Sequence, residues 1–271
     1  MENLVNQYCI NPLLLLKYRW KYFESSRNFS GTFSDTLLAD ENAESLLINY
    51  FRNRNFPGII FSEEILKTGP PLKMGDKYTV AIDPLDGSMN FMRKTRLPYS
   101  ALITILESTS PKYSDAIATA VISLTDNDLW YAERGKGCFY KGRYSENKPI
   151  RCEVSDKTLW RNRESFAFIE IYTQRDAEIR SKLPNGFFRN LGSAALEMAL
   201  VAEGCADGRI SSCQKAHELV AGNLLIGEAG GINLTFQGLP ISDLEYDFNA
   251  TIPSIQACNA DIAKFLLKAV S

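Results

Sequence analysis

The chain has 271 residues, and its 30 Lys and Arg against 32 Asp and Glu give a formal net charge of −2. A chain of this length buries a large core, as one big domain or two closely joined ones, which excludes a small disulfide-stapled module. The balanced charge, without a long run of one sign, excludes a nucleic-acid surface or a charged tail and indicates a small-molecule partner.

The first predicted element is an amphipathic helix from about Asp40 to Arg54. Its apolar residues recur at intervals of three and four, which places them on one helix face. Pro57-Gly58 ends the helix. The apolar positions are Ala43, Leu46, Leu47, Tyr50 and Phe51.

Two short predicted strands follow, and each ends in acidic residues. Gly58–Phe61 leads into Ser62-Glu63-Glu64, and Tyr78–Ile82 leads into Asp83-Pro-Leu-Asp86. Asp-Pro-x-Asp-Gly alone is an ordinary turn signal, since proline fixes φ and glycine accepts positive φ. The alternative interpretation is a turn that binds metal. The motif alone does not distinguish the two, so the other motifs of the chain are needed.

Three apolar, β-prone runs come next without a helix between them, as is typical of an antiparallel sheet. They are Ser100–Leu106, Ala116–Leu124 and Leu129–Ala132, and glycine-rich turns are expected from Gly135 to Gly142. From about residue 150, helices alternate with strands. The elements predicted there are a helix from Gly192–Ala195 to Gly204, a strand at Gly208–Ser212, a helix at Ala216–Ala229, a strand at Ile232–Phe236 and a helix at Ala260–Val270.

These patterns predict an α/β (α+β) chain of two halves. Residues 1–148 form an N-terminal α+β half that carries the acidic strand ends, and residues 149–271 form a C-terminal α/β half. No internal repeat or low-complexity linker separates the halves. We therefore expect one continuous catalytic unit with a shared core.

The cysteines and the single histidine exclude further classes. The six cysteines are scattered without a CxxC pair and without a signal peptide, which predicts reduced thiols in a cytoplasmic protein. Leu13–Leu16 is the longest aliphatic block, far short of the ~20 residues of a membrane helix. Because His217 is the only histidine, a His-rich zinc site is excluded, and the residues around it contain no G-x-S-x-G nucleophile elbow. The chemistry must therefore rest on carboxylates and on oxygen-seeking metals such as Mg²⁺.

Four acids, Glu63, Asp83, Asp86 and Glu218, suit such a metal, although each could instead be a solvated terminus or a helix cap. The proline between the two aspartates restricts the turn, so that both carboxylates and the Leu85 carbonyl can be directed toward one point. A divalent cation would offset the repulsion between the carboxylates. Gly87-Ser88 then lets backbone N–H groups face an anion. These parts together suit a metal-bridged phosphate site.

The sequence resembles the inositol monophosphatase family, within the superfamily of lithium-sensitive and fructose-1,6-bisphosphate phosphatases. The resemblance spans roughly residues 36 to 236, and several motifs in order at family spacing make it specific. The motifs are Ser62-Glu63-Glu64, Asp83-Pro-Leu-Asp-Gly-Ser-Met-Asn-Phe91, Tyr131-Ala-Glu-Arg-Gly-Lys-Gly137, Gly192-Ser-Ala-Ala195 and Glu228-Ala-Gly-Gly231.

The resemblance implies a layered αβαβα sandwich and a Mg²⁺-dependent phosphomonoesterase with two or three metal ions. It also implies Mn²⁺ as an alternative cofactor, Li⁺ or Ca²⁺ as inhibitors, a small phosphorylated substrate and a homodimer. The implied metal ligands are Glu63, Asp83, the Leu85 carbonyl, Asp86 and Glu218. The implied catalytic residues are Asp40, Glu63 and Ser88, of which Asp40 and the Ser88 hydroxyl help to activate the attacking water. Gly87 and Ser88 are the implied phosphate cradle, with Ser88 where the family usually has threonine, and Gly192, Ser193 and Ala194 would face the alcohol part of the substrate.

The chain departs from the family where the usual Trp-Asp is replaced by His217-Glu218. Glutamate is one methylene longer and can still reach a metal, as it does in the fructose-bisphosphatase branch; the alternative is a helix-start charge. We expect His217 to be a packed, hydrogen-bonded residue. Asp40 has an alternative role as a helix N-cap. Glu64 is left outside the metal set.

The expected substrates are inositol 1-phosphate or fructose 1,6-bisphosphate. Ser211 stands where inositol-specific relatives carry a glutamate, and Arg209 lies on the same strand face. A neutral group beside a guanidinium favours a second phosphate, so Arg209 and Ser211 are predicted to bind substrate; the alternative is that Arg209 points to solvent and Ser211 only packs. Rival functions are a 3′-phosphoadenosine 5′-phosphate phosphatase and a non-catalytic relative.

Overall fold

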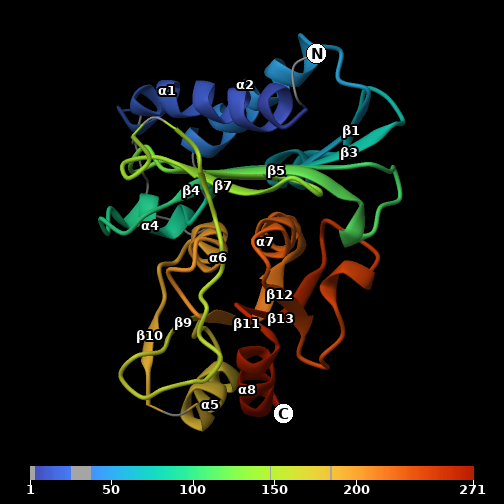
Figure 1. Ribbon diagram of the computed structural model, residues 1–271. Helices are drawn as coiled ribbons and strands as arrows, with labels where there is room; N and C mark the ends of the chain where they lie inside the picture. Colours follow the sequence, from blue (N-terminus) through green and yellow to red (C-terminus); the bar gives the residue numbers. More distant parts are fainter. Residues whose placement is uncertain (1–3, 26–37, 147, 184) are drawn as a thin grey trace.

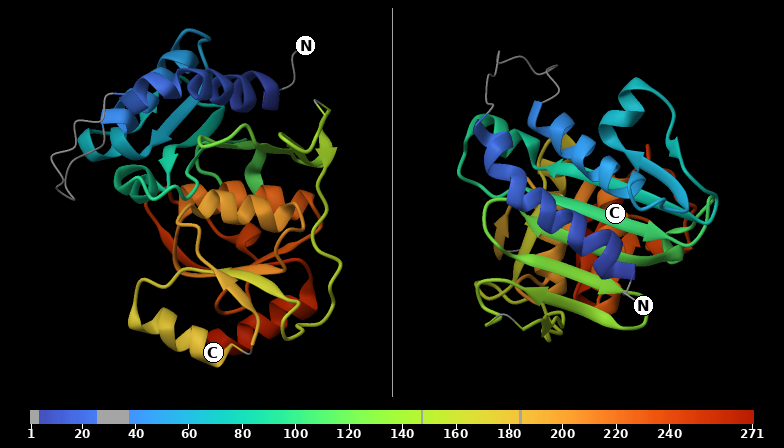
Figure 2. Two further views of the ribbon diagram at one scale, coloured as in Figure 1. Left: turned by 90° about the vertical axis from the view of Figure 1, so that its left-hand side faces the viewer. Right: turned by 90° about the horizontal axis from the view of Figure 1, so that it is seen from above.

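The computed structural model describes residues 4–25, 38–146, 148–183 and 185–271, which form five stacked layers (Figure 1). Figure 2 shows the same order of layers from the side. This is the αβαβα sandwich that the resemblance implies, and the predicted α/β fold class is confirmed. The layers are helices α1 (Asn11–Ser25) and α2 (Leu38–Arg52), an eight-stranded sheet, helices α6 (Ala194–Ala202) and α7 (Ala216–Glu228), a five-stranded sheet, and helices α5 (Gln174–Lys182) and α8 (Ala260–Val270).

The larger sheet has the order β2-β1-β3-β4-β5-β6-β7-β8. Strands β1 and β3 are parallel, and the other neighbours are antiparallel. Strand β4 is apolar along most of its length because helices cover both faces of the sheet. The strands are β1 (Gly58–Ser62), β2 (Leu72–Lys73), β3 (Tyr78–Asp86), β4 (Ser100–Leu106), β5 (Ala116–Ser123), β6 (Leu129–Glu133), β7 (Gly137–Lys141) and β8 (Ile150–Arg151).

The smaller sheet has the order β10-β9-β11-β13-β12. Strand β11 is parallel to β9 and antiparallel to β13. Its end leads directly into α7, so the sheet fixes where that helix begins. The strands are β9 (Phe166–Ile169), β10 (Phe187–Arg189), β11 (Gly208–Lys215), β12 (Ile232–Thr235) and β13 (Thr251–Ala257).

Three hydrophobic clusters fill the spaces between the layers. Leu47 and Ile103 belong to the cluster between α1, α2 and the larger sheet, and Ile255 and Leu266 belong to the cluster under α8. The largest cluster contains Leu102 of the larger sheet and Leu225 of α7, so it draws on both halves of the chain. Helices α6 and α7 are buried on almost every side because they lie between two sheets.

The motif at the β6–β7 turn is tied to the motif at the end of α7. The carboxylate of Glu228 accepts hydrogen bonds from the backbone N–H groups of Gly135 and Gly137, both at 2.7 Å. Both motifs contribute to the resemblance, and their contact holds α7 against the larger sheet.

Most predicted helices and strands are confirmed, with ends that differ by a few residues. The segment Asp83–Asp86 was expected to be a turn and is instead the end of β3. The turns expected at Gly135–Gly142 were wrong in part, because Gly137–Lys141 forms strand β7. Elements that the patterns did not predict are η1 (Asn6–Ile10), α1, α3 (Glu63–Thr68), α4 (Ser88–Arg93), η2 (Tyr113–Asp115), η3 (Ile241–Asp243), α5 and strands β2, β8, β9, β10 and β13.

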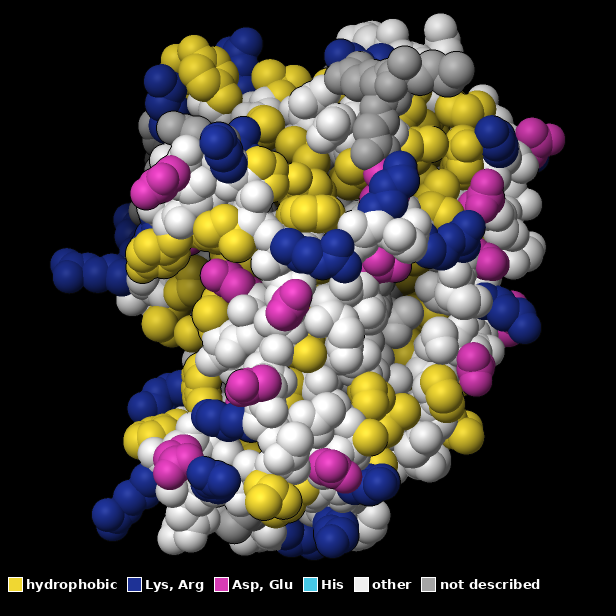
Figure 3. All heavy atoms as spheres, in the orientation of Figure 1, with side chains coloured by type: hydrophobic (Ala, Val, Ile, Leu, Met, Phe, Trp, Pro, Cys, Tyr) yellow, Lys and Arg dark blue, Asp and Glu magenta, His cyan; other side chains and the backbone are white. Residues whose placement is uncertain are grey.

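The surface bears charges of both signs. Figure 3 shows Lys, Arg, Asp and Glu side chains interspersed on one face of the molecule. All six cysteines are free thiols. No helix among the described residues combines the length and the apolar character that a membrane span requires. Residues 36–37, at the start of the span of family resemblance, lie outside the described residues.

Candidate metal centre

The structure brings the four predicted metal-binding acids together. Ligand atoms of Asp83, Asp86 and Glu218 lie within 4.8 Å of one another, and so do those of Glu63, Asp83 and His217. Asp83 belongs to both groups. This arrangement suits two neighbouring cations that share one carboxylate.

A β-bulge in β3 positions the two aspartates. Asp83 lies opposite Leu102 and Asp86 lies opposite Ser100, so β3 has one residue more than β4 over this stretch. The backbone N–H of Leu85 donates to Asp83 Oδ1 at 3.0 Å, and both aspartates are buried. The role of the Leu85 carbonyl stays a prediction.

Asp86 joins the metal centre to the start of α6. Both of its carboxylate oxygens accept hydrogen bonds, and a carboxylate is favoured at a helix N-terminus by the helix dipole. The predicted substrate motif Gly192–Ala195 is thereby held against the acids. The donors are Ser100 Oγ at 2.9 Å, Ser193 Oγ at 2.5 Å, Ala194 N at 3.1 Å and Ala195 N at 3.0 Å.

At the predicted phosphate cradle, the backbone at Gly87 passes close to the backbone at Gly192. Gly87 has φ +86°, and a Cβ there would come within 3.0 Å of the Gly192 carbonyl oxygen. Only glycine combines this conformation with this approach. Ser88 follows as the first residue of α4. Phosphate binding by Gly87 and Ser88 stays a prediction.

Helix α2 contributes Asp40 and Glu44 to the neighbourhood. Asp40 is buried inside the first turn of α2, so the alternative that it is the N-cap does not hold, and its Oδ1 has no hydrogen-bond partner among the described residues. Glu44 Oε1, one turn further, accepts from the backbone N–H groups of Glu64 at 3.1 Å and Ile65 at 3.0 Å. Glu44 thus caps α3, whose first residue is Glu63. Sequence reasoning missed this role, although the i, i+4 spacing from Asp40 placed Glu44 on the same helix face.

Glu44→Ala is expected to lower the stability of the protein by about 1–2 kcal/mol, because two buried N–H groups at the start of α3 lose their acceptor. It should also lower the phosphatase activity that the resemblance implies, since α3 begins with Glu63. Urea denaturation and phosphate release measure the two effects. Glu41→Ala, at an exposed position of the same helix turn, is the matched control. Equal behaviour of the two variants would contradict the capping role.

The electrostatics of the cluster favour a bound cation. Burial, together with the charge of Asp83, raises the pKa of Asp40 and of Asp86. Burial and the charge of Asp86 raise the pKa of Glu218 well above its usual range. Burial alone would also raise the pKa of Asp83, but His217 and Lys215 outweigh it and hold that pKa below its usual value. A divalent cation relieves this repulsion, and the oxygen-rich donor set fits one.

Two lysines lie beside the cluster. Lys215 Nζ is 3.0 Å from Glu63 Oε2, and Lys67 Nζ is 2.5 Å from Glu64 Oε1. The placement of Glu64 outside the metal set stays a prediction, since Glu63 also has a lysine partner. Sequence reasoning did not single out Lys215; its position three residues before Glu218 was the available signal.

Arg209 and Ser211 do not face solvent. Arg209 is fully buried and binds two carboxylates, Glu197 Oε2 at 2.8 Å and Glu170 Oε1 at 2.6 Å. The Ser211 hydroxyl donates to the other oxygen of Glu170 at 2.5 Å. The sequence predicted a neutral Ser211 beside an Arg209 guanidinium that could bind phosphate. The structure instead places both residues in a network of buried carboxylates. Substrate binding by these residues stays a prediction, and the geometry favours a structural role for Arg209.

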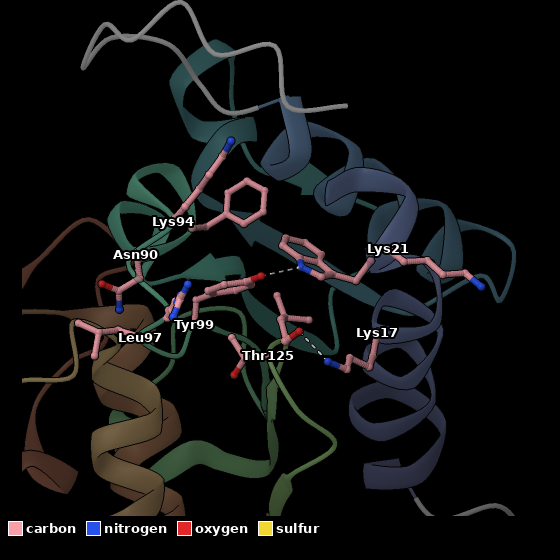
Figure 4. A pocket seen from close by; sticks show the side chains of 11 residues that line it. Lys17, Lys21, Asn90, Lys94, Leu97, Tyr99 and Thr125 are labelled. Carbon is pink, nitrogen blue, oxygen red and sulfur yellow. Dashed lines mark hydrogen bonds between the residues drawn. The ribbon is translucent and has the colours of Figure 1, made fainter. Parts of the chain in front are cut away.

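A basic pocket of about 460 Å³ lies beside α4 (Figure 4). Its wall includes Lys17 and Lys21 of α1 and Lys94 at the end of α4, and Lys17 Nζ donates to the Leu124 carbonyl at 2.6 Å. Asn90 also lines it and donates to the carbonyl oxygen of Leu191, just before the Gly192 motif, at 2.6 Å. None of the predicted metal ligands lines this pocket, so it is separate from the metal centre.

The layered fold and the cluster with a shared carboxylate are those expected of a metal-dependent phosphatase. Residues 13–269 match the model of the inositol monophosphatase family. The chain therefore belongs to the inositol monophosphatase family, as the motifs predict.

Individual relatives agree with this assignment. The chain is 31% identical over 218 residues to the Nus factor SuhB of Escherichia coli (strain K12), a match that covers 79% of this chain and 76% of that protein. It is 28% identical over 228 residues to a fructose-1,6-bisphosphatase/inositol-1-monophosphatase of Thermotoga maritima, covering 83% and 80% of the two chains. The structure of the extragenic suppressor protein suhB from Bartonella henselae shares the fold, with a TM-score of 0.79, 22% identity and 99% of each chain covered.

Proposed function

We propose that the protein is a Mg²⁺-dependent phosphomonoesterase that hydrolyses small sugar or inositol phosphates. The observation that carries this proposal is the buried Asp83, whose carboxylate belongs to two groups of metal-binding side chains at once. When bound, Mg²⁺ supplies positive charge against the phosphate oxygens and makes a water molecule more acidic.

The residues of the chain divide the remaining tasks. Glu63, Asp83, Asp86, Glu218 and the Leu85 carbonyl would hold the metal. Gly87 and Ser88 would hold the phosphate. The buried Asp40, whose Oδ1 has no hydrogen-bond partner among the described residues, would accept a proton from the attacking water together with the Ser88 hydroxyl. Gly192, Ser193 and Ala194 would border the alcohol part of the substrate.

A phosphate-release panel with and without Mg²⁺ tests the proposal. The substrates are inositol 1-phosphate, fructose 1,6-bisphosphate and 3′-phosphoadenosine 5′-phosphate. The name of the Thermotoga maritima relative supports the first two as substrates. A strong preference for the third would replace the proposal with a nucleotide phosphatase, and no Mg²⁺-dependent release from any of the three would support a non-catalytic relative.

Glu218→Gln is expected to raise the Mg²⁺ concentration needed for half-maximal activity by about tenfold or more, which corresponds to ~1.4 kcal/mol of lost binding. The reason is the loss of one ligand charge, and the substrate KM should change much less. Mg²⁺ titrations of phosphate release measure both. Glu178→Gln on the exposed face of α5 is the matched control. An unchanged Mg²⁺ requirement would make Glu218 a helix-start charge only.

A further inference from the structure

His217 is a buried imidazole fixed by aromatic packing. Its side chain is 5% exposed, and its ring stacks on Phe248 with centroids 4.6 Å apart. Phe248 in turn stacks on Phe61 of β1, at 5.8 Å. The stack holds the ring at one orientation beside the acidic cluster.

Both ring nitrogens of His217 lack a hydrogen-bond partner among the described residues. Nε2 points toward two carboxylates, at 3.5 Å from Asp83 Oδ2 and 4.0 Å from Glu63 Oε2. Buried polar atoms in folded proteins almost always have a partner. This nitrogen faces two carboxylates and is placed to share a third group with them.

A metal ion fits that third position. Bonds from such ions to nitrogen and oxygen ligands are about 2.0–2.2 Å long, so two ligands of one ion lie at most about 4.2 Å apart. Both separations from Nε2 are shorter than this limit. Both separations from Nε2 therefore meet this condition for a shared ion, and the ligand atoms of all three residues lie within 4.8 Å of one another.

We propose that His217 Nε2 is a ligand of the metal ion that Glu63 and Asp83 hold, and that this position favours a transition-metal ion such as Co²⁺ over Mg²⁺. The inference rests on the metal centre of the proposed function. Imidazole suits transition metals, whereas the group Asp83, Asp86 and Glu218 offers only oxygen and suits Mg²⁺. The two metal positions are therefore chemically different.

The test uses the untagged full chain, in which His217 is the only histidine. Metal-free protein is titrated with Co²⁺ and followed by proton NMR, in which a Co²⁺-bound imidazole gives a strongly shifted ring N–H signal that exchanges with solvent. Calorimetry gives the dissociation constants of Co²⁺ and Mg²⁺. His217→Phe keeps a ring against Phe248 and removes the nitrogen. Phe248→Leu removes the stacking partner and keeps the nitrogen.

The expected result is one shifted N–H signal in the parent and in Phe248→Leu, and none in His217→Phe. His217→Phe should bind Co²⁺ at least about tenfold more weakly, with less than about a threefold change for Mg²⁺. A Co²⁺-loaded parent without the signal, or unchanged Co²⁺ affinity in His217→Phe, would overturn the proposal. If His217→Phe does not fold, His217→Gln replaces it with the same readouts. No substrate is involved, so a failure here leaves the phosphatase proposal standing, and an inactive protein leaves this one standing.

Discussion

Asp83→Asn is expected to reduce Mg²⁺-dependent phosphate release by about three orders of magnitude, a barrier increase of ~4 kcal/mol, and to leave the fold intact. Asp83 is the carboxylate common to both donor groups, so the substitution removes a ligand charge from two metal positions at once. Asparagine has almost the same shape, and its side-chain oxygen can still accept the hydrogen bond from the Leu85 N–H. The damage is therefore electrostatic and not structural.

Phosphate release over a wide range of Mg²⁺ concentrations and thermal unfolding without metal measure the effects of Asp83→Asn. The metal-free variant should unfold at a slightly higher temperature than the parent, because one repelling charge is gone. Asp76→Asn, on the exposed loop before β3, is the control and should match the parent. Activity within about tenfold of the parent would refute Asp83 as a shared metal ligand.

Arg209→Met is expected to destabilise the protein by about 3–5 kcal/mol. Methionine fills much of the same space, but it leaves the buried carboxylates of Glu170 and Glu197 without their counter-charge. Removing one partner of a buried ion pair costs more than the pair contributes, because the remaining charge stays desolvated. Urea denaturation of the metal-free protein measures the loss.

Two further variants make this result specific. Arg134→Met removes an exposed pair with Glu107 and should change stability by less than about 1 kcal/mol. The triple variant Arg209→Met, Glu170→Gln, Glu197→Gln should recover part of the loss, because no charge is left unpaired. A small effect of Arg209→Met, or no recovery in the triple variant, would show that the network is not a desolvated ion-pair cluster.

Much of the fold could be predicted from the sequence, because packing in layers imposes local patterns of apolar and polar residues on each element. A strand with helices on both faces, such as Ser100–Leu106, is apolar along most of its length, so its limits are visible in the sequence. The acids that were expected to bind metal stand at strand and helix ends, where turn residues mark them. That is why Glu63, Asp83, Asp86 and Glu218 could be selected before their proximity was known.

The features that the sequence did not predict depend on contacts between residues far apart in the chain. Arginine is rarely buried, and the partners of Arg209 lie 12 and 39 positions away, so nothing nearby indicated an interior ion pair. Strand β13 contains Pro253, which argues against a strand when the sequence is read alone. His217 was expected to be packed and hydrogen-bonded: the packing is confirmed by the stack on the distant Phe248, which no local pattern indicated, and neither ring nitrogen has a hydrogen-bond partner among the described residues by distance and angle.

The bulge in β3 determines which face of the sheet the side chains of Asp83 and Asp86 point to. In an unbroken strand, side chains alternate between the two faces, so residues three apart point in opposite directions. Asp83 and Asp86 are three apart, yet their carboxylates meet on one side, because the extra residue in β3 reverses the alternation once. The spacing of the motif and the bulge therefore belong together: two intervening residues bring both carboxylates to one face only with the bulge, and in a regular strand the same spacing would direct them to opposite faces of the sheet.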